Sequence, residues 1–101
     1  MKYCLLMLSL LFEFFVNAQE PRLVLPIGHT SWINSVQFSN DNRKVITTSA
    51  DNTAKMWDAN TGDLLLTIKG HKGSVEFATF NSDGTKVITT SEDGTSKIWN
   101  T

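Results

Sequence analysis

A repeat of 42 residues governs most of this chain. The pair Gly28-His29 recurs as Gly70-His71, and the same offset places residues 44–49 (KVITTS) on residues 86–91 without a mismatch. Aligning residues 28–59 with 70–101 gives 14 identities in 32 positions without a gap, where chance gives about two. A period of this length is typical of repeat architectures, in which each unit buries its apolar face against its neighbours.

Each unit predicts short strands rather than helices. Stretches rich in Val, Ile and Thr are separated by Asn, Asp and Gly turns at short intervals, as in all-β folds. The first unit predicts strands at Ile33–Phe38, Lys44–Ser49, 53–57 and Leu64–Ile68, and the second predicts them at Val75–Phe80, Lys86–Ser91 and 95–99. The printed sequence ends at Thr101, before a fourth strand of the second unit.

The order of residues within each unit is more specific than its strand pattern. A Gly-His pair precedes a strand ending in Phe, an Asp turn, and a Ser-x-Asp-x-Thr-x-Lys-x-Trp run. Trp57-Asp58 closes the first run and Trp99-Asn100 the second. Over residues 22–101 this pattern resembles the WD-repeat (WD-40 type) β-propeller family. The resemblance implies blades that are four-stranded antiparallel sheets arranged around a channel.

We therefore expect an all-β, partial β-propeller over residues 19–101, with two four-stranded antiparallel blades. Repeat 1 covers about 28–69 and repeat 2 about 70–101. The outer strand of the second blade is either missing or supplied by the segment from Leu23 to Ile27, which precedes the first Gly-His as Leu64–Ile68 precedes the second. Because two edges stay open, we expect residues 19–101 not to form a stable monomer. Either the natural protein is longer, or copies associate as trimers or tetramers with six or eight blades.

The family resemblance also assigns roles to a set of polar residues. In WD-repeat proteins a His, a Ser or Thr, an Asp and a Trp form a buried hydrogen-bonded tetrad in each blade. The resemblance implies one structural tetrad of His29, Ser49, Asp51 and Trp57, and a second of His71, Ser91, Asp93 and Trp99. The same Ser, His and Asp residues could in principle supply a nucleophilic triad. Their repetition in both units favours the structural interpretation, because an enzyme rarely installs its nucleophile in every blade.

The first 18 residues predict a secretory signal peptide. Lys2 supplies a positive charge, residues 3–16 are mostly apolar, and Ala18 ends a small-residue site before Gln19. The apolar run is shorter than the roughly 20 residues that a transmembrane helix needs. We expect cleavage after Ala18, no stable membrane anchor afterwards, and a secreted or periplasmic protein. The alternatives are an uncleaved anchor and an amphipathic segment that does not direct secretion.

Composition excludes several kinds of site. The net charge of −1 carries no basic footprint for nucleic acid. The single Cys4 lies in the leader, so residues 19–101 have no disulfide or thiolate metal site. The Asp residues fall in turns, where they ordinarily bond the backbone. We therefore expect no metal, no cofactor and no catalytic residue.

Three residues are candidates for binding a protein partner. Trp32 follows the first Gly-His pair, while its equivalent in the second unit is Ser74. It is therefore either an exposed anchor for a partner or a cover for the edge of the first blade. Ala50 and Glu92 precede the two tetrad aspartates and differ from each other, as contact residues often do.

The sequence thus predicts a non-catalytic, exported WD-repeat scaffold that binds an unidentified protein and forms the N-terminal part of a larger propeller. The alternative function is a recognition or regulatory propeller module within a larger exported multidomain enzyme. A continuing reading frame after Thr101 would distinguish the two.

Overall fold

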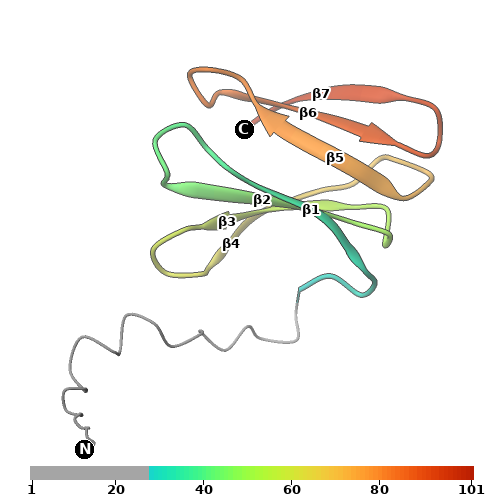
Figure 1. Cartoon of the computed structure of the whole chain (residues 1–101), viewed down its shortest axis with the longest axis horizontal. Helices are drawn as coiled ribbons and strands as arrows, with labels where there is room; N and C mark the ends of the chain where they lie inside the picture. The colour runs from blue at the N-terminus through green and yellow to red at the C-terminus, as the bar shows by residue number, and fades with distance from the viewer. Residues whose placement is uncertain (1–27) are drawn as a thin grey trace, which may run out of the picture.

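The computed structural model describes residues 28–101, which fold into seven β-strands and contain no helix (Figure 1). The expected signal peptide at 1–18 and the expected outer strand at 23–27 lie outside the described residues. The strands are β1 (Ile33–Phe38), β2 (Lys44–Ser49), β3 (Ala54–Asp58), β4 (Leu64–Ile68), β5 (Val75–Phe80), β6 (Lys86–Ser91) and β7 (Ser96–Asn100).

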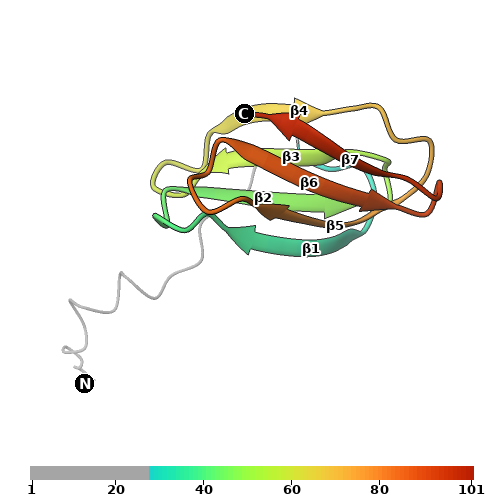
Figure 2. The same ribbon diagram turned by 90° about the horizontal axis from the view of Figure 1, so that it is seen from above.

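The strands form two antiparallel sheets, each in simple chain order. The first sheet has the order β1-β2-β3-β4 and the second the order β5-β6-β7. The two sheets are stacked, with β5 near β1 and β2 of the first sheet (Figure 2). The prediction of an all-β, partial propeller with two unclosed blades is confirmed, and within the described residues the second blade has three strands.

The third strand of each blade begins and ends one residue later than expected. The sequence predicts strands at 53–57 and 95–99, whereas β3 begins at Ala54 and β7 at Ser96. The reason is that Thr53 belongs to the preceding turn, where both its amide and its hydroxyl donate to Asp51. At the other end, Asp58 still pairs with Lys44 on β2.

The tight turns repeat with interchangeable residues. Asn42 and Asn52 have positive φ angles of 61° and 73°. The second repeat places Gly84 and Gly94 at the equivalent positions, with φ angles of 74° and 85°. Asn and Gly are the residues that adopt this left-handed conformation at least cost.

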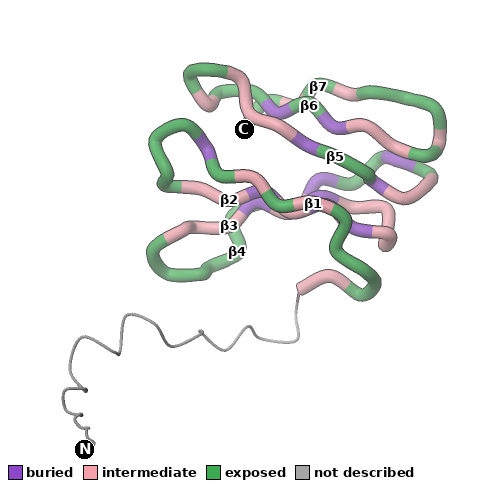
Figure 3. Tube along the Cα trace, viewed as in Figure 1, coloured by how far each residue is buried: buried purple, intermediate pink, exposed green. Residues whose placement is uncertain are grey.

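The core lies between the two sheets, where buried positions of both blades meet (Figure 3). Apolar side chains alternate along β2, β3, β5 and β6 so that one face of each sheet points into this layer. The buried members are Ile46, Ala54, Met56, Ile68, Val75, Ala78 and Val87, with Phe80 and Trp99 packed against them. The core is therefore an interface between blades rather than the interior of either one.

Candidate functional site

In the first blade, four side chains from different elements form one hydrogen-bonded network. His29, which precedes β1, lies with its Nδ1 2.9 Å from Oδ2 of Asp51 in the β2–β3 turn. Its Nε2 lies 2.7 Å from the hydroxyl oxygen of Thr47 on β2. The indole N–H of Trp57 on β3 donates to the same hydroxyl oxygen at 2.9 Å. The His29 side chain is only 2% exposed and that of Asp51 9% exposed, while Thr47 and Trp57 are half-buried.

The direction of these hydrogen bonds follows from what each group can donate. Trp57 can only donate, so the Thr47 oxygen accepts from it. The Thr47 hydroxyl is then free to donate to Nε2 of His29, which places the imidazole proton on Nδ1, where it donates to Asp51. Every member thereby has a partner, as buried polar groups require.

Asp51 is the most heavily hydrogen-bonded group of the site. Oδ2 accepts from His29 and from the Thr30 amide at 3.0 Å, and Oδ1 accepts from the Thr53 hydroxyl at 2.6 Å and the Thr53 amide at 2.9 Å. Burial raises the pKa of this carboxyl, but the hydrogen bonds from Thr53, Thr30 and His29 outweigh it and hold the pKa well below its ordinary value. Asp51 is thus a fixed anion that ties the chain before β1 to the β2–β3 turn.

The second blade repeats the network almost atom for atom. His71 contacts Asp93 through Nδ1 at 3.0 Å and the Thr89 hydroxyl through Nε2 at 2.7 Å, and Trp99 donates to Thr89 at 2.8 Å. The hydroxyl of Thr95 and the amide of Lys72 donate to Asp93 and hold its pKa well below the ordinary value, against the opposing effect of burial.

This second network belongs to the layer between the blades. Thr89 is fully buried, and Trp99 packs on the core beside His71, with the ring centroids 6.2 Å apart at 68°. The first network lies on the opposite face of its own sheet, which no second sheet covers within the described residues.

The serine assignments of the tetrads are wrong: Thr47 and Thr89 are the hydroxyl members, not Ser49 and Ser91. Ser49 lies at the end of β2, where its oxygen accepts from the Asp51 amide at 3.0 Å and its hydroxyl donates to the Ser31 carbonyl at 3.3 Å. Ser91 makes the equivalent bonds to the Asp93 amide and the Gly73 carbonyl. The serines therefore fix the turns, while the threonines two residues earlier join His to Trp.

The hydrogen bonds of these threonines also decide whether Ser49 or Ser91 could act as the nucleophile of a catalytic triad. A nucleophilic serine must have its oxygen hydrogen-bonded to the histidine that takes its proton. In both blades that position belongs to a threonine whose oxygen also accepts the indole N–H. The network is suited to holding the turn, the first strand and the third strand in one arrangement.

Three further aspartates bond the backbone of their own turns, as the sequence predicted. Asp41 accepts from the Arg43 amide, Asp58 from the Asn60 and Thr61 amides, and Asp83 from the Thr85 amide. No three His, Cys, Asp or Glu side chains come together as a metal site within residues 28–101. Nor does this part of the chain contain a helix that is long and apolar enough to cross a membrane.

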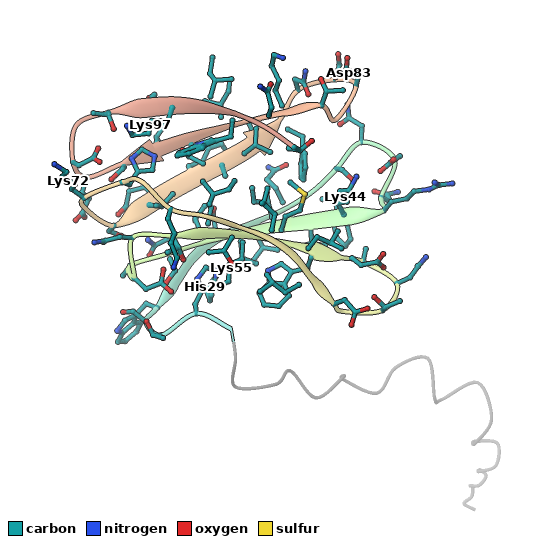
Figure 4. The ribbon with its side chains drawn as sticks, turned by 180° about the vertical axis from the view of Figure 1, so that it is seen from behind. His29, Lys44, Lys55, Lys72, Asp83 and Lys97 are labelled. Atoms are coloured by element: carbon teal, nitrogen blue, oxygen red, sulfur yellow. The ribbon has the colours of Figure 1, made fainter. Side chains whose placement is uncertain are left out.

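The three candidate binding residues gather at one end of the blades. The Ala50 amide donates to the Trp32 carbonyl at 2.9 Å, and the Glu92 amide makes the same bond to Ser74. We call this end, with its loops at 28–32, 50–53, 69–74 and 92–95, the loop end. Figure 4 shows His29 and Lys72 here, with Lys44 and Asp83 at the opposite end of the sheets. The Trp32 side chain is 83% exposed. Its role as an anchor for a protein partner stays a prediction.

The threonines of the networks are functional residues that the sequence pattern did not single out. Thr47, Thr53, Thr89 and Thr95 are identical between the repeats, and that identity was the available signal.

Two small antiparallel sheets of consecutive strands, stacked face to face and each tied together by a His–Thr–Trp–Asp network, define a pair of propeller blades. The family described as "WD domain, G-beta repeat" matches residues 20–58 and 62–100, which is most of the chain. The chain therefore belongs to the WD-repeat family, whose repeats serve as protein-interaction modules.

Individual relatives match over about one repeat. The chain is 49% identical over 41 residues to the "Protein pleiotropic regulator PRL2" of Arabidopsis thaliana, which is 41% of this chain and 9% of the relative. It is 46% identical over 41 residues to the "Pre-mRNA-splicing factor PRP46" of Yarrowia lipolytica, an alignment that covers 41% of this chain and 9% of the relative. It is 41% identical over 43 residues to the "Probable E3 ubiquitin ligase complex SCF subunit sconB" of Arthroderma otae, 43% and 6%. The aligned part is less than a tenth of each of these relatives.

Proposed function

We propose that this chain is a non-catalytic binding segment of an exported WD-repeat propeller and that it presents its loop end to a protein partner. The single observation that carries the proposal is the contrast at this end of the blades. The polar residues that resemble a catalytic set are paired with one another in both networks, while Trp32 beside them is 83% exposed.

The exposed Trp32 offers a large aromatic surface to a partner. Aromatic side chains bury large areas and dominate the energetics of many interfaces. Ala50 and Glu92 lie one residue before the two network aspartates, so the same framework presents both of them. Their chemical difference supports a contact role, because the framework around them is the same in both repeats.

Relatives and sequence support two further parts of the proposal. One relative is named as a subunit of a complex, which supports binding rather than catalysis as the role of this repeat. Export rests on the leader alone: a positive Lys2, an apolar run and Ala18 before the expected cleavage.

The experiment is site-directed photo-crosslinking in the producing cell. A photoreactive residue replaces Glu92 at the loop end, and a control replaces Thr61 in the exposed β3–β4 turn. We expect a crosslinked protein from position 92 but not from position 61, identified by mass spectrometry.

The matched variant is Trp32→Ser, because Ser74 is the natural residue at the equivalent position of the second repeat. It should abolish the crosslink from position 92 while the far-ultraviolet circular dichroism stays unchanged. A crosslink that survives Trp32→Ser, or equal products from positions 92 and 61, would contradict the proposed loop-end function.

A further inference from the structure

Within residues 28–101, the two sheets leave two apolar faces uncovered, one on each side of the pair. The first outer face is the side of β1–β3 that carries Ile33, Val36, Phe38, Val45 and Trp57. The second outer face is the side of β5–β7 that carries Phe77, Ile88 and Ile98. Val36 is 59% exposed and Ile98 67%. Apolar surfaces of this kind commonly mark binding sites.

The first outer face repeats a surface that is already buried elsewhere in the molecule. Each of its five residues aligns with a residue of β5–β7 that lies 42 positions later and forms the core or packs on it. These residues are Val75, Ala78, Phe80, Val87 and Trp99. The register is also the same, because Val36 lies opposite Thr47 and Ala78 opposite Thr89. The first outer face thus has the pattern of a surface that receives a neighbouring blade.

The second outer face repeats the surface on the other side of that same interface. Ile88 corresponds to Ile46 and Ile98 to Met56, both of which are buried between the blades. Thr90 corresponds to Thr48, which is also fully buried there. Phe77 differs, because its equivalent in the observed interface is the smaller Ser35. Apart from that position, the two outer faces correspond to the two halves of the observed blade–blade interface.

Two of the polar contacts of the interface carry over unchanged and a third is reversed, whereas the bond from Asn34 to the Val75 carbonyl at 2.8 Å has no equivalent, because the Glu76 carboxylate cannot donate. Across the observed interface, Asn40 donates to the Ser82 carbonyl at 2.9 Å and Thr48 donates to the Glu76 carbonyl at 3.4 Å. At the equivalent donor positions the second outer face has Ser82 and Thr90, whose hydroxyls can donate in the same direction.

A third contact is kept with its polarity reversed. Asn34 donates to the Ser74 hydroxyl at 2.8 Å across the observed interface. On the outer faces, Glu76 stands at the position of Asn34 and Trp32 at the position of Ser74. The Glu76 carboxylate can accept where Asn34 donates, and the Trp32 indole N–H can donate where Ser74 accepts. The change at one position thus matches the change at the other. This contact uses only the indole N–H of Trp32 and adds to the role proposed for that residue at the loop end.

We propose that the second outer face binds the first outer face of another copy of this chain, head to tail, and so repeats the internal blade–blade interface between molecules. Because the two faces differ, the contact is heterologous and leads to a ring if the rotation closes. The described residues of each copy supply two blades, so among the rings of about 4–8 blades that propellers commonly form, the six- and eight-bladed rings expected from the sequence take three and four copies of this 101-residue polypeptide.

The test uses protein obtained by expressing the full 101-residue sequence and measures its mass by light scattering. Wild type should give about three or four times the mass of one chain. Val36→Arg blocks the first outer face and Ile98→Arg the second, so each variant alone should be a monomer. Thr61→Arg adds the same charge in the β3–β4 turn and should keep the wild-type mass.

Mixing the two blocked variants distinguishes head-to-tail binding from other modes. Each has one intact face of the opposite kind, so an equimolar mixture should form a dimer and nothing larger. A wild-type monomer at tens of micromolar, a mixture that stays monomeric, or a dimer of either variant alone would overturn the proposal. If an Arg variant loses its circular dichroism signal, Val36→Thr and Ile98→Thr replace it and should lower the mass with the fold intact.

The outcome is separable from that of the proposed function. Light scattering of Trp32→Ser at several concentrations reports copy association, while crosslinking at position 92 reports the loop-end partner. Normal association with a lost crosslink supports the loop-end function, and weakened association with a retained crosslink supports the contact between copies alone.

Discussion

Replacing Thr47 with valine removes one hydroxyl while leaving the shape of the side chain almost unchanged. That hydroxyl oxygen accepts from Trp57 at 2.9 Å, and its proton is directed to His29 at 2.7 Å. An ordinary intramolecular hydrogen bond contributes about 0.5–1.5 kcal/mol, so losing two costs about 1–3 kcal/mol of unfolding free energy. For a domain of this size a loss of about 2 kcal/mol lowers Tm by roughly 8–16 °C.

The assay is urea and thermal denaturation followed by far-ultraviolet circular dichroism, because three tryptophans complicate fluorescence. Ser49→Ala is the control from the same strand, since Ser49 is fully buried but bonds neither His29 nor Trp57. It loses the hydrogen bonds with the Asp51 amide and the Ser31 carbonyl, so it should also cost about 1–3 kcal/mol, but it should show no coupling to Trp57→Phe. Thr89→Val is an internal replicate and should cost at least as much as Thr47→Val, because Thr89 is fully buried.

A double-mutant cycle with Trp57→Phe isolates the Trp–Thr hydrogen bond. We expect a coupling between Thr47→Val and Trp57→Phe of about 1 kcal/mol, since contacting residues are not additive. If Thr47→Val stays within about 0.5 kcal/mol of wild type, or if Ser49→Ala couples to Trp57→Phe as strongly as Thr47→Val does, the reasoning about the network is refuted.

Three further predictions concern acid stability, a close backbone contact and export. The folded-state pKa values of Asp51 and Asp93 are lowered from the ordinary 3.8; stability should therefore be full above about pH 5 and fall as the pH drops below about 4. Urea midpoints should show this decline, with a shallower slope for Asp51→Asn, and a wild-type midpoint that does not change between pH 5 and 3 would contradict it. Gly70→Ala should destabilise the fold more than Gly62→Ala, because a Cβ at Gly70 would lie 2.9 Å from the Trp99 ring. A Cβ at Gly62 would meet no atom within 4 Å, so that change adds only the backbone strain of a φ of +79°, a cost of about 1–2 kcal/mol. Equal urea midpoints for the two variants would contradict this. Protein exported by the producing cell should begin at Gln19 by intact mass, and a retained leader on cytosolic protein would disprove the signal peptide.

Most of the strand bounds were predictable because the same pattern of strand and turn residues occurs in both repeats. β1, β2, β4, β5 and β6 have the bounds that the sequence predicts. The third strands were misplaced by one residue because Thr53 suits a strand by its β-branching, yet its hydroxyl is used by the turn. Strand propensity does not contain that local preference, in which the Asp51 side chain two residues earlier accepts from Thr53.

The composition of the networks was only partly predictable, for a related reason. Thr47 and Ser49 lie two residues apart on β2 and so point to the same side of the strand. The register between β2 and β3 determines which of the two hydroxyls bonds Trp57. Thr47 lies opposite Lys55, within reach of Trp57, whereas Ser49 lies beyond the last residue of β2 that pairs with β3. A single sequence does not give register to that precision.

The contact between blades also needed three dimensions. The sequence indicated that two blades leave surface uncovered, but the register and burial show that the uncovered faces are the two halves of one interface. The exposed Trp32 gains a candidate neighbour in Glu76 of another copy only through that equivalence.

The most direct test of the central claim, that threonine-centred structural networks occupy the place of a Ser–His–Asp catalytic set, is two-dimensional ¹H–¹⁵N NMR of the imidazole and indole groups. We expect Thr47→Val to shift both the His29 Nε2 and the Trp57 indole N–H resonances, while Ser49→Ala leaves both in place. A His29 Nε2 resonance that responds to Ser49→Ala and not to Thr47→Val would contradict the account and restore the serine as the partner of the histidine.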